Sequence, residues 1–214
     1  MKKVLFFATT IVALTACNSS ETKVETVEKQ QVATIVDGKI YTVDASSTVT
    51  WTGSKPTGKH SGTFSVKEGS FIVKDNTLVG GKFTIDINSL NNQDLATDTA
   101  MKAKLEGHLK SSDFFDVAKY PTANFEITEV QASTDTSKKD VTHIIKGNLT
   151  LKDSTKNISI PARVTVDAAT LTATADFSID RTLWGMSYKG PNNPQDWVIS
   201  KAVGLKLDIR ATKK

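Results

Sequence analysis

The stretch Val141–Leu151 reads VTHIIKGNLTL. Every second position, starting at Val141, carries Val, His, Ile, Gly, Leu and Leu, while the positions between them carry Thr, Ile, Lys, Asn and Thr. A β-strand places successive side chains on opposite faces of its sheet. The alternation therefore predicts a strand with one mainly apolar face and one mainly polar face.

The same period of two extends through much of the chain. It is clear over 157–167, 171–180 and 202–209. Weaker strands fit 40–44, 48–52, 62–66, 69–74, 78–87 and 122–130. Eight or more short strands at this spacing predict an all-β fold, either an antiparallel barrel or a sandwich.

One segment, about 97–115, departs from this alternation. Met101, Leu105 and Leu109 recur at a spacing of four residues, which predicts a short amphipathic helix. A helical insertion between strands can plug or cover one end of a barrel. We find no internal repeat and no second apolar core, so the sequence predicts a single domain over residues 40–212.

The composition excludes several classes of protein. The 214 residues carry 27 Lys and Arg against 23 Asp and Glu, a formal net charge of +4, and 38% are hydrophobic. These values are typical of a folded globular domain rather than a disordered chain. Spans of about 20 apolar residues, which a polytopic membrane protein needs, are absent from the sequence. Lys and Arg do not cluster as in proteins that bind nucleic acid, so we expect no nucleic-acid partner.

The N-terminus carries the pattern of an export signal. Lys2 and Lys3 precede an apolar run over 4–14, which is too short to span a bilayer and is typical of a signal peptide over 1–16. The run ends in Leu14-Thr15-Ala16-Cys17, which resembles a bacterial lipobox. Cys17 is the only cysteine, so lipidation accounts for an otherwise unpaired thiol. The alternative is an ordinary signal peptide with an incidental cysteine.

Residues 17–39 are polar and rich in Thr and Ser, which predicts a lipidated N-terminus followed by a flexible tether. A weak helical stripe is the alternative for this segment. Asn18 follows Cys17, and the absence of Asp at this place favours an outer-membrane anchor facing the periplasm. The membrane, reached through the lipid anchor, is therefore one expected partner.

Five stretches together resemble the YceI-like family of exported proteins, over roughly 40–210. These stretches are Trp51–Pro56 with Gly58–Phe64, Gly80–Asp86, Leu105–Ser111 with Asp113–Asp116, Tyr120–Glu126 and Asp180–Tyr188. The resemblance implies a lipocalin-like antiparallel β-barrel of about eight strands. It also implies binding of a polyisoprenoid or a similar long amphiphilic lipid in an apolar pore, without enzymatic activity.

The apolar residues on the alternating faces are the candidate lining of such a pore. They are Trp51, Phe64, Phe71, Phe83, Ile85, Phe125, Ile127, Ile145, Leu149, Ile160, Val164, Phe177, Trp184 and Leu205. Lys55, His60 and Arg181 are candidates for contact with a polar headgroup. Arg181 can instead pair with Asp180 and order the loop that follows. We expect no cofactor other than a bound isoprenoid-type lipid.

Two other functions compete with lipid binding. Aromatic side chains inside a β-domain usually form a packed core, which would suit a structural or stress-related envelope protein without a ligand. His60-Ser61 would suit a hydrolase, but the sequence has no Gly-x-Ser-x-Gly motif and we expect no catalytic residues. The three histidines have no metal-binding spacing, so no metal site is expected either.

Overall fold

A computed structural model describes residues 22–35, 37–190 and 198–214. The expected signal peptide and Cys17 lie outside the described residues.

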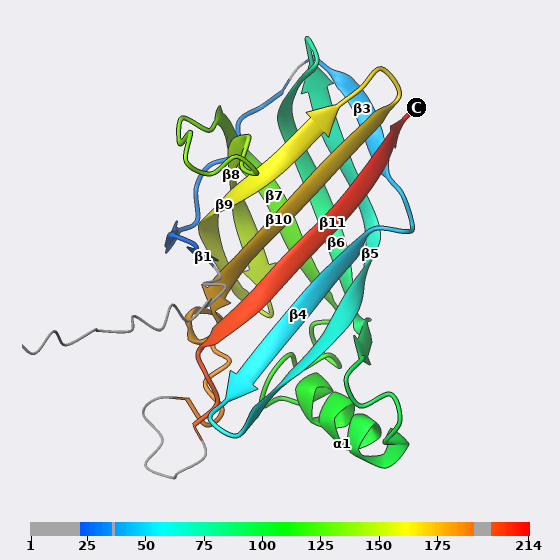
Figure 1. Ribbon diagram of the computed structural model, residues 1–214, viewed down its shortest axis with the longest axis vertical. Coiled ribbons are helices and arrows are strands. Elements are labelled where there is room, and N and C mark those ends of the chain that lie inside the picture. Colours follow the sequence, from blue (N-terminus) through cyan, green and yellow to red (C-terminus); the bar gives the residue numbers. More distant parts are fainter. Residues whose placement is uncertain (1–21, 36, 191–197) are drawn as a thin grey trace, which may run out of the picture.

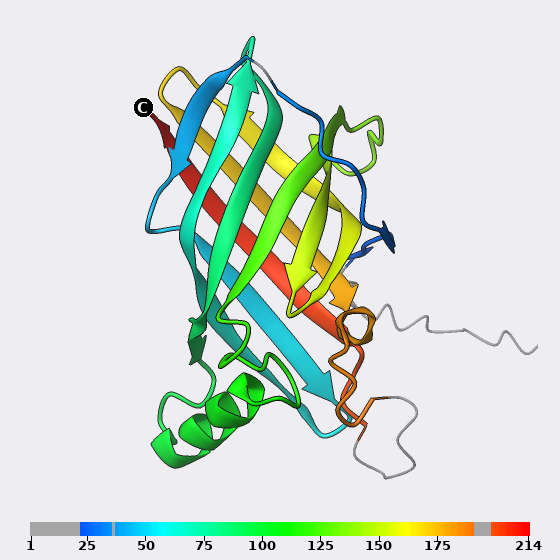
Figure 2. The same cartoon turned by 180° about the vertical axis from the view of Figure 1, so that it is seen from behind.

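The described chain forms a closed antiparallel β-barrel (Figures 1 and 2). Its eight strands pair in sequence order and close where the last strand pairs with the first. The strands are β4 (Thr48–Lys55), β5 (Gly58–Lys74), β6 (Thr77–Asn92), β7 (Thr122–Ala132), β8 (His143–Leu151), β9 (Ser154–Val166), β10 (Thr170–Asp180) and β11 (Ala202–Lys213). The prediction of an all-β fold is confirmed. Of the two architectures that the sequence allows, the chain forms the barrel and not the sandwich.

The apolar faces of the alternating strands point into the barrel, as the sequence predicts. In β8, Ile145 is 6% exposed and pairs with the buried Ile160 of β9. In β10, Leu171 and Phe177 are buried on the same inward face. The period of two therefore identifies the inner wall of the barrel.

Strands β5 and β6 are longer than their sequence pattern suggests. The sequence divides them into shorter strands because irregularities interrupt the alternation. Their pairing shifts between Thr63 and Ser65, between Val66 and Glu68, and between Ile72 and Val73. The first shift leaves three extra residues on β6, and each of the other two leaves one extra residue on one strand. Such irregularities bend the strand, which lets a long strand curve around a closed barrel.

The two ends of the barrel differ. At one end, β3 (Lys39–Val43) pairs with both β5 and β11, beyond the start of β4. At the other end lie α1 (Thr99–Lys110) and the short helix η1 (Arg181–Trp184) (Figure 1). We call these the β3 end and the α1 end. The predicted helix over 97–115 is thus present, and Asp98 caps it by accepting a hydrogen bond from the Met101 N–H.

Part of the segment expected to be a tether is docked on the barrel. β1 (Thr22–Lys23) pairs with β10, and β2 (Thr26–Glu28) pairs with β9. β9 and β10 pair directly only over 162–166 and 171–175, so the segment fills the gap where they separate. The expectation of a flexible tether over 17–39 is corrected for this described part.

Specific contacts hold this segment in place. Val24 is 5% exposed, and its N–H donates to the Ser178 carbonyl. The Asn148 side chain bonds both main-chain groups of Gln30, at 3.0 and 2.8 Å. The chain then runs along the outside of the barrel toward β3 (Figure 2), where Ile35 packs on Gly80. The polar composition of this segment does not predict the docking, because most of the contacts are main-chain hydrogen bonds, which do not depend on the type of side chain.

No helix in the described residues is long and apolar enough to cross a membrane.

Candidate functional site

A cavity of about 700 Å³ occupies the α1 half of the barrel. Inward-facing side chains of the strands form its wall, and they include Val49, Trp51, Phe64, Ile85, Ile87, Ala123, Leu149, Leu151, Ile179, Val203 and Leu205. These residues are almost all apolar because each occupies the inner face of an alternating strand. The volume falls within the range of ordinary ligand pockets, about 300–1,000 Å³.

The helix and the segment after it form one side of the cavity mouth. Leu105 and Leu109 of α1 border the cavity, followed by Phe114 and Phe115. The Phe115 ring packs edge-on against Phe64, with 5.5 Å between ring centroids. The predicted apolar stripe of the helix therefore faces the cavity, and the helix covers part of the barrel end.

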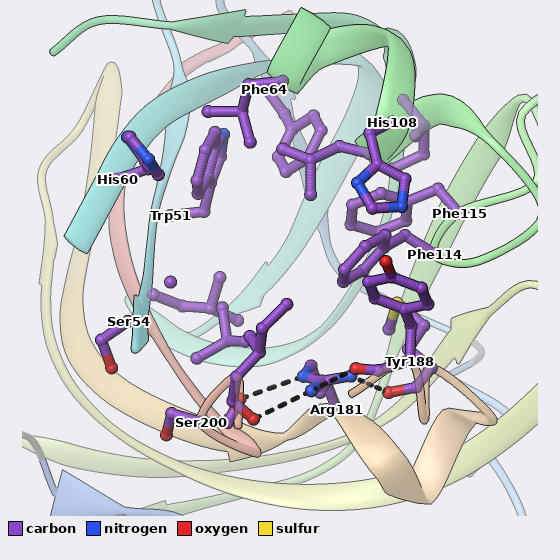
Figure 3. A pocket seen from close by; sticks show the side chains of 18 of the residues that line it. Trp51, Ser54, His60, Phe64, His108, Phe114, Phe115, Arg181, Tyr188 and Ser200 are labelled. Atoms are coloured by element: carbon purple, nitrogen blue, oxygen red, sulfur yellow. Dashed lines mark hydrogen bonds between the residues drawn. The ribbon is translucent and has the colours of Figure 1, made fainter. Parts of the chain in front are cut away.

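His108 joins a small aromatic cluster at this mouth (Figure 3). Its ring lies edge-on to Tyr188, at 4.8 Å between centroids, and to Phe114, at 5.2 Å. Its Nε2 lies 2.9 Å from a carboxylate oxygen of Asp113. The cluster links α1 to the segment after η1, so two distant parts of the sequence build one rim.

Arg181 is buried beside the cavity and holds that second segment by its main chain. Its Nε donates to the Ser200 carbonyl and its Nη2 to the carbonyls of Tyr188 and Ile199, each at 3.0 Å. Nη1 donates to the Met186 carbonyl. Figure 3 shows these bonds converging on the guanidinium at the cavity wall.

The alternative of an Asp180–Arg181 pair is not what orders the loop. Asp180 instead accepts hydrogen bonds from Thr182 and lies 3.3 Å from the Lys201 ammonium. Burial raises the pKa of Asp180, but these bonds outweigh it and lower the pKa overall. Burial lowers the pKa of Arg181, and the charge of Asp180 offsets part of that effect. Arg181 remains a cation with an apolar cavity on one side.

His60 and Asp94 form a pair at the mouth. His60 Nδ1 lies 2.7 Å from Asp94 Oδ2, and Asp94 Oδ1 accepts from the Ser61 N–H. Partial burial opposes ionisation of Asp94, but the bonds from Ser61, His60 and Asn92 outweigh it and lower its pKa from 3.8 to about 2. Asp94 therefore stays ionised and orients the His60 ring.

This pair does not assemble a hydrolytic site with Ser61. Neighbouring residues of a strand point to opposite faces, and His60 borders the cavity whereas Ser61 does not. Within residues 22–35, 37–190 and 198–214, no group of three His, Cys, Asp or Glu side chains is placed to hold a metal ion.

The structure divides the predicted lining residues into two groups. Trp51, Phe64, Ile85, Leu149 and Leu205 border the cavity, and so do the headgroup candidates Lys55, His60 and Arg181. The others do not border it. They are Phe71, Phe83, Phe125, Ile127, Ile145, Ile160, Val164, Phe177 and Trp184.

Most of this second group packs in the β3 half of the barrel. Phe83, Phe125 and Phe177 each lie one inward position beyond a wall residue of the same strand (Ile85, Ala123 and Ile179), on the side of the β3 end, so they belong to the packed core next to the cavity. Above them Phe71 is 2% exposed, and its ring packs on Phe83 at 4.9 Å between centroids. Phe83 and Phe125 also border a separate, more polar depression of about 590 Å³. The barrel is therefore hollow in one half and packed in the other.

The sequence analysis missed the residues that complete the mouth. Lys104, His108, Phe114, Met186, Tyr188 and Ser200 all border the cavity. The spacing of Met101, Leu105 and Leu109 points to the helix face, and the resemblance already includes the motifs that contain His108, Phe114 and Tyr188. No local pattern places Ser200 at the mouth, because its position depends on the bonds made by Arg181.

A closed antiparallel barrel with an apolar cavity open at one end is a lipocalin-like β-barrel. Residues 41–211 match the model of the YceI-like domain, and the chain belongs to this family. Residues 1–18 match the model of the prokaryotic membrane lipoprotein lipid attachment site. Both resemblances seen in the sequence are thus confirmed.

Relatives of known sequence are UPF0312 proteins. One from Pseudomonas aeruginosa (strain LESB58) is 40% identical over 103 residues, which is 48% of each chain. One from Enterobacter sp. (strain 638) is 36% identical over 103 residues, 48% of this chain and 47% of the relative. The chain spans about half the length of the curated relatives it matches.

Two solved structures share the fold. BcnA of Burkholderia cenocepacia has a TM-score of 0.61 at 20% identity, covering 79% of this chain and 99% of its own. A polyisoprenoid binding domain from Saccharophagus degradans, implicated in plant cell wall breakdown, has a TM-score of 0.60 at 15% identity. That comparison covers 83% of this chain and all of the domain.

Proposed function

We propose that this protein binds the hydrocarbon chain of a polyisoprenoid or a similar long amphiphilic lipid in the barrel cavity, and carries or stores it without chemical change. The observation that carries this proposal is the apolar cavity of about 700 Å³ with one open end. The polyisoprenoid-binding domain with the same fold supports the choice of ligand class.

The size of the cavity limits how much chain it can hold. At about 30 Å³ for each methylene-sized group, taken from the volume of a water molecule, the cavity holds roughly 20 such groups. Each buried CH₂ contributes about 0.8 kcal/mol, part of which is offset by ordering the chain. A longer lipid would leave its remaining carbons and its headgroup outside the barrel.

The mouth suits a polar or anionic headgroup. Lys55, His60 and Arg181 border the cavity, together with Lys104 and Lys189. Such cations and ring N–H groups can bond phosphate or hydroxyl oxygens. We propose that the headgroup rests among them while the chain fills the apolar interior.

We propose further that Cys17 carries the lipid anchor and that the anchor lies in the outer membrane, with the barrel facing the periplasm. The match of residues 1–18 to a lipoprotein attachment site supports the anchor. Asn18, in place of Asp, supports the choice of membrane.

The competing functions have less support. A structural protein with a packed core accounts for the β3 half but not for the cavity in the α1 half. A hydrolase would need a nucleophile beside His60, and Ser61 faces away from it. We therefore propose a binding protein rather than an enzyme.

Organic extraction of the purified lipidated protein, followed by mass spectrometry, tests this function. We expect a non-covalent lipid beside the anchor, and uptake of a fluorescent prenyl lipid. Leu205→Trp, which fills the cavity, should reduce uptake at least tenfold. Lys206→Trp, one residue further along β11 but exposed, should leave it unchanged. Absence of any extractable lipid together with no uptake would refute the proposal.

A further inference from the structure

The N-terminal segment meets the barrel nearer to its open end. Thr22 pairs with Phe177, three residues before Asp180 and the end of β10 at the cavity mouth. From Cys17 to Thr22 the chain spans at most about 18 Å, because an extended chain covers no more than about 3.6 Å per residue. If Cys17 is acylated, as proposed above, the barrel is held close to the bilayer on the side of the mouth.

The α1 end carries exposed apolar side chains, and one of them, Met101, borders the cavity. Met101 of α1 is 50% exposed and Leu183 of η1 is 42% exposed, although both are large and apolar. Both project from short helices rather than from the rigid wall. Exposed apolar groups at a pocket mouth are typical of surfaces that contact a membrane or another protein.

Basic side chains lie at the same end of the barrel, and two of them, Lys55 and Lys104, border the cavity. Lys55 and Lys59 are exposed at the turn between β4 and β5, and Lys104 is exposed on α1. Rim carboxylates are present but engaged: Asp94 bonds His60, Asp113 bonds His108 and Asp180 lies beside Lys201. Exposed apolar side chains together with lysines at one end of the barrel match the interface of a bilayer that contains anionic lipids.

We propose that the α1 end of the barrel docks on the bilayer that holds the anchor, with Met101 and Leu183 at the interface and the rim lysines on anionic headgroups. Lysines near such a surface are attracted to its negative charge. The cavity then opens directly onto the lipid. A hydrocarbon chain can pass between bilayer and barrel with little exposure to water, which removes most of the cost of leaving the bilayer.

Site-specific fluorescence on the lipidated protein tests the docking. Cys17 is acylated in that form, so a new thiol is the only site of labelling. Ser187 is exposed between Met186 and Tyr188, which border the cavity, so Ser187→Cys places an environment-sensitive dye at the mouth. Thr77→Cys places the dye at the β3 end, where β6 begins. In vesicles with one third phosphatidylglycerol, we expect at least threefold stronger quenching by nitroxide lipids at 187 than at 77. Equal quenching at the two sites, or none at either, would overturn the proposal.

Matched variants separate the side-chain contribution from that of the tether. Leu183→Gln with Met101→Gln, or Lys59→Glu with Lys104→Glu, should reduce the quenching at 187 at least twofold. Ile40→Gln, an equally exposed apolar residue on β3, should not change it. An unchanged signal in both double variants would show that the mouth makes no contact of its own and would also overturn the docking.

This result is distinguishable from a failure of the proposed function. If lipid is recovered by extraction but the dye at 187 is not quenched more strongly than the dye at 77, the binding function stands and the docking is refuted. If the dye at 187 is quenched more strongly but no lipid is extracted or taken up, the docking stands and the binding function is refuted.

Discussion

At the scale of single residues, Arg181 joins parts of the chain that are distant in sequence. Its guanidinium bonds carbonyls before and after the segment 191–197, including those of Tyr188 and Ser200. No other side chain presents five N–H donors in one rigid plane. One arginine can therefore hold the chain on both sides of 191–197 at the cavity wall without a carboxylate partner.

Arg181→Met should lower the free energy of unfolding by at least about 3 kcal/mol, because it leaves several buried carbonyls without donors. Arg181→Lys keeps the charge but not the planar donors, so it should recover only part of this loss. Arg210→Met, on an exposed arginine of β11, should change the stability little. Urea unfolding curves measure all three, and equal stability of the 181 and 210 variants would contradict this role.

Asp94 gives the protein a pH-dependent contact at the mouth. Its folded-state pKa is about 2, below the usual 3.8, so its bonds stabilise the fold above about pH 4. This stabilisation is lost as the pH falls from about 4 toward 2. After allowance for solvent screening, it amounts to about 1 kcal/mol at most.

Asp94→Asn should therefore lower the melting temperature by a few degrees at pH 7, and the difference from the native protein should shrink between pH 4 and pH 2. Thermal melts across this range measure it. Asp153→Asn in the β8–β9 turn serves as the control and should show no such convergence. A difference in melting temperature that stays constant down to pH 2 would contradict the assignment.

At the scale of elements, the docked N-terminal segment completes the barrel wall. β9 and β10 separate at the α1 side, and β1 and β2 supply the missing main-chain partners. Unpaired strand edges are costly and prone to aggregation. The segment thus protects an edge that the eight barrel strands leave open.

Val24→Asp should release this segment, because a carboxylate cannot be buried there without a partner. We expect a loss of about 1–3 kcal/mol in the free energy of unfolding and rapid proteolysis within 22–35. Val27→Asp, on a 43% exposed residue of the same segment, should change neither. If both variants resist the protease equally, the segment is not held through Val24.

An element could be located from the sequence where its side chains alternate regularly between apolar and polar. Strands such as β8, β9 and β10 alternate cleanly and could be located from sequence. The full lengths of β5 and β6 could not, because bulges break the period. β1 and β2 could not either, since their pairing uses main-chain groups that every sequence possesses.

At the scale of the whole molecule, the barrel interior changes from hollow to packed along its axis. Alternation predicts which side chains point inward, such as Phe125 and Leu149, but not their depth or how fully they fill the space. That filling depends on how side chains of neighbouring strands fit together. Phe125 lies over Gly147, where a β-carbon would come within 2.2 Å of its ring. Such complementarity is a tertiary property that one strand does not encode.

Phe125 lies one inward position beyond the wall residue Ala123, so its ring is part of the core that separates the cavity from the β3 end. Phe125→Ala should lengthen the cavity toward the β3 end, so that the best-bound member of a prenyl series becomes longer by at least one five-carbon unit. It should also cost about 3–5 kcal/mol of stability. Phe71→Ala should cost as much but leave the chain-length preference unchanged, because Phe71 lies further toward the β3 end and Phe83 still packs between it and the cavity. Competition between prenyl alcohols of different length measures the preference. A shift of equal size in both variants would mean that a general loss of core packing, rather than the position of the Phe125 ring, determines the preferred chain length.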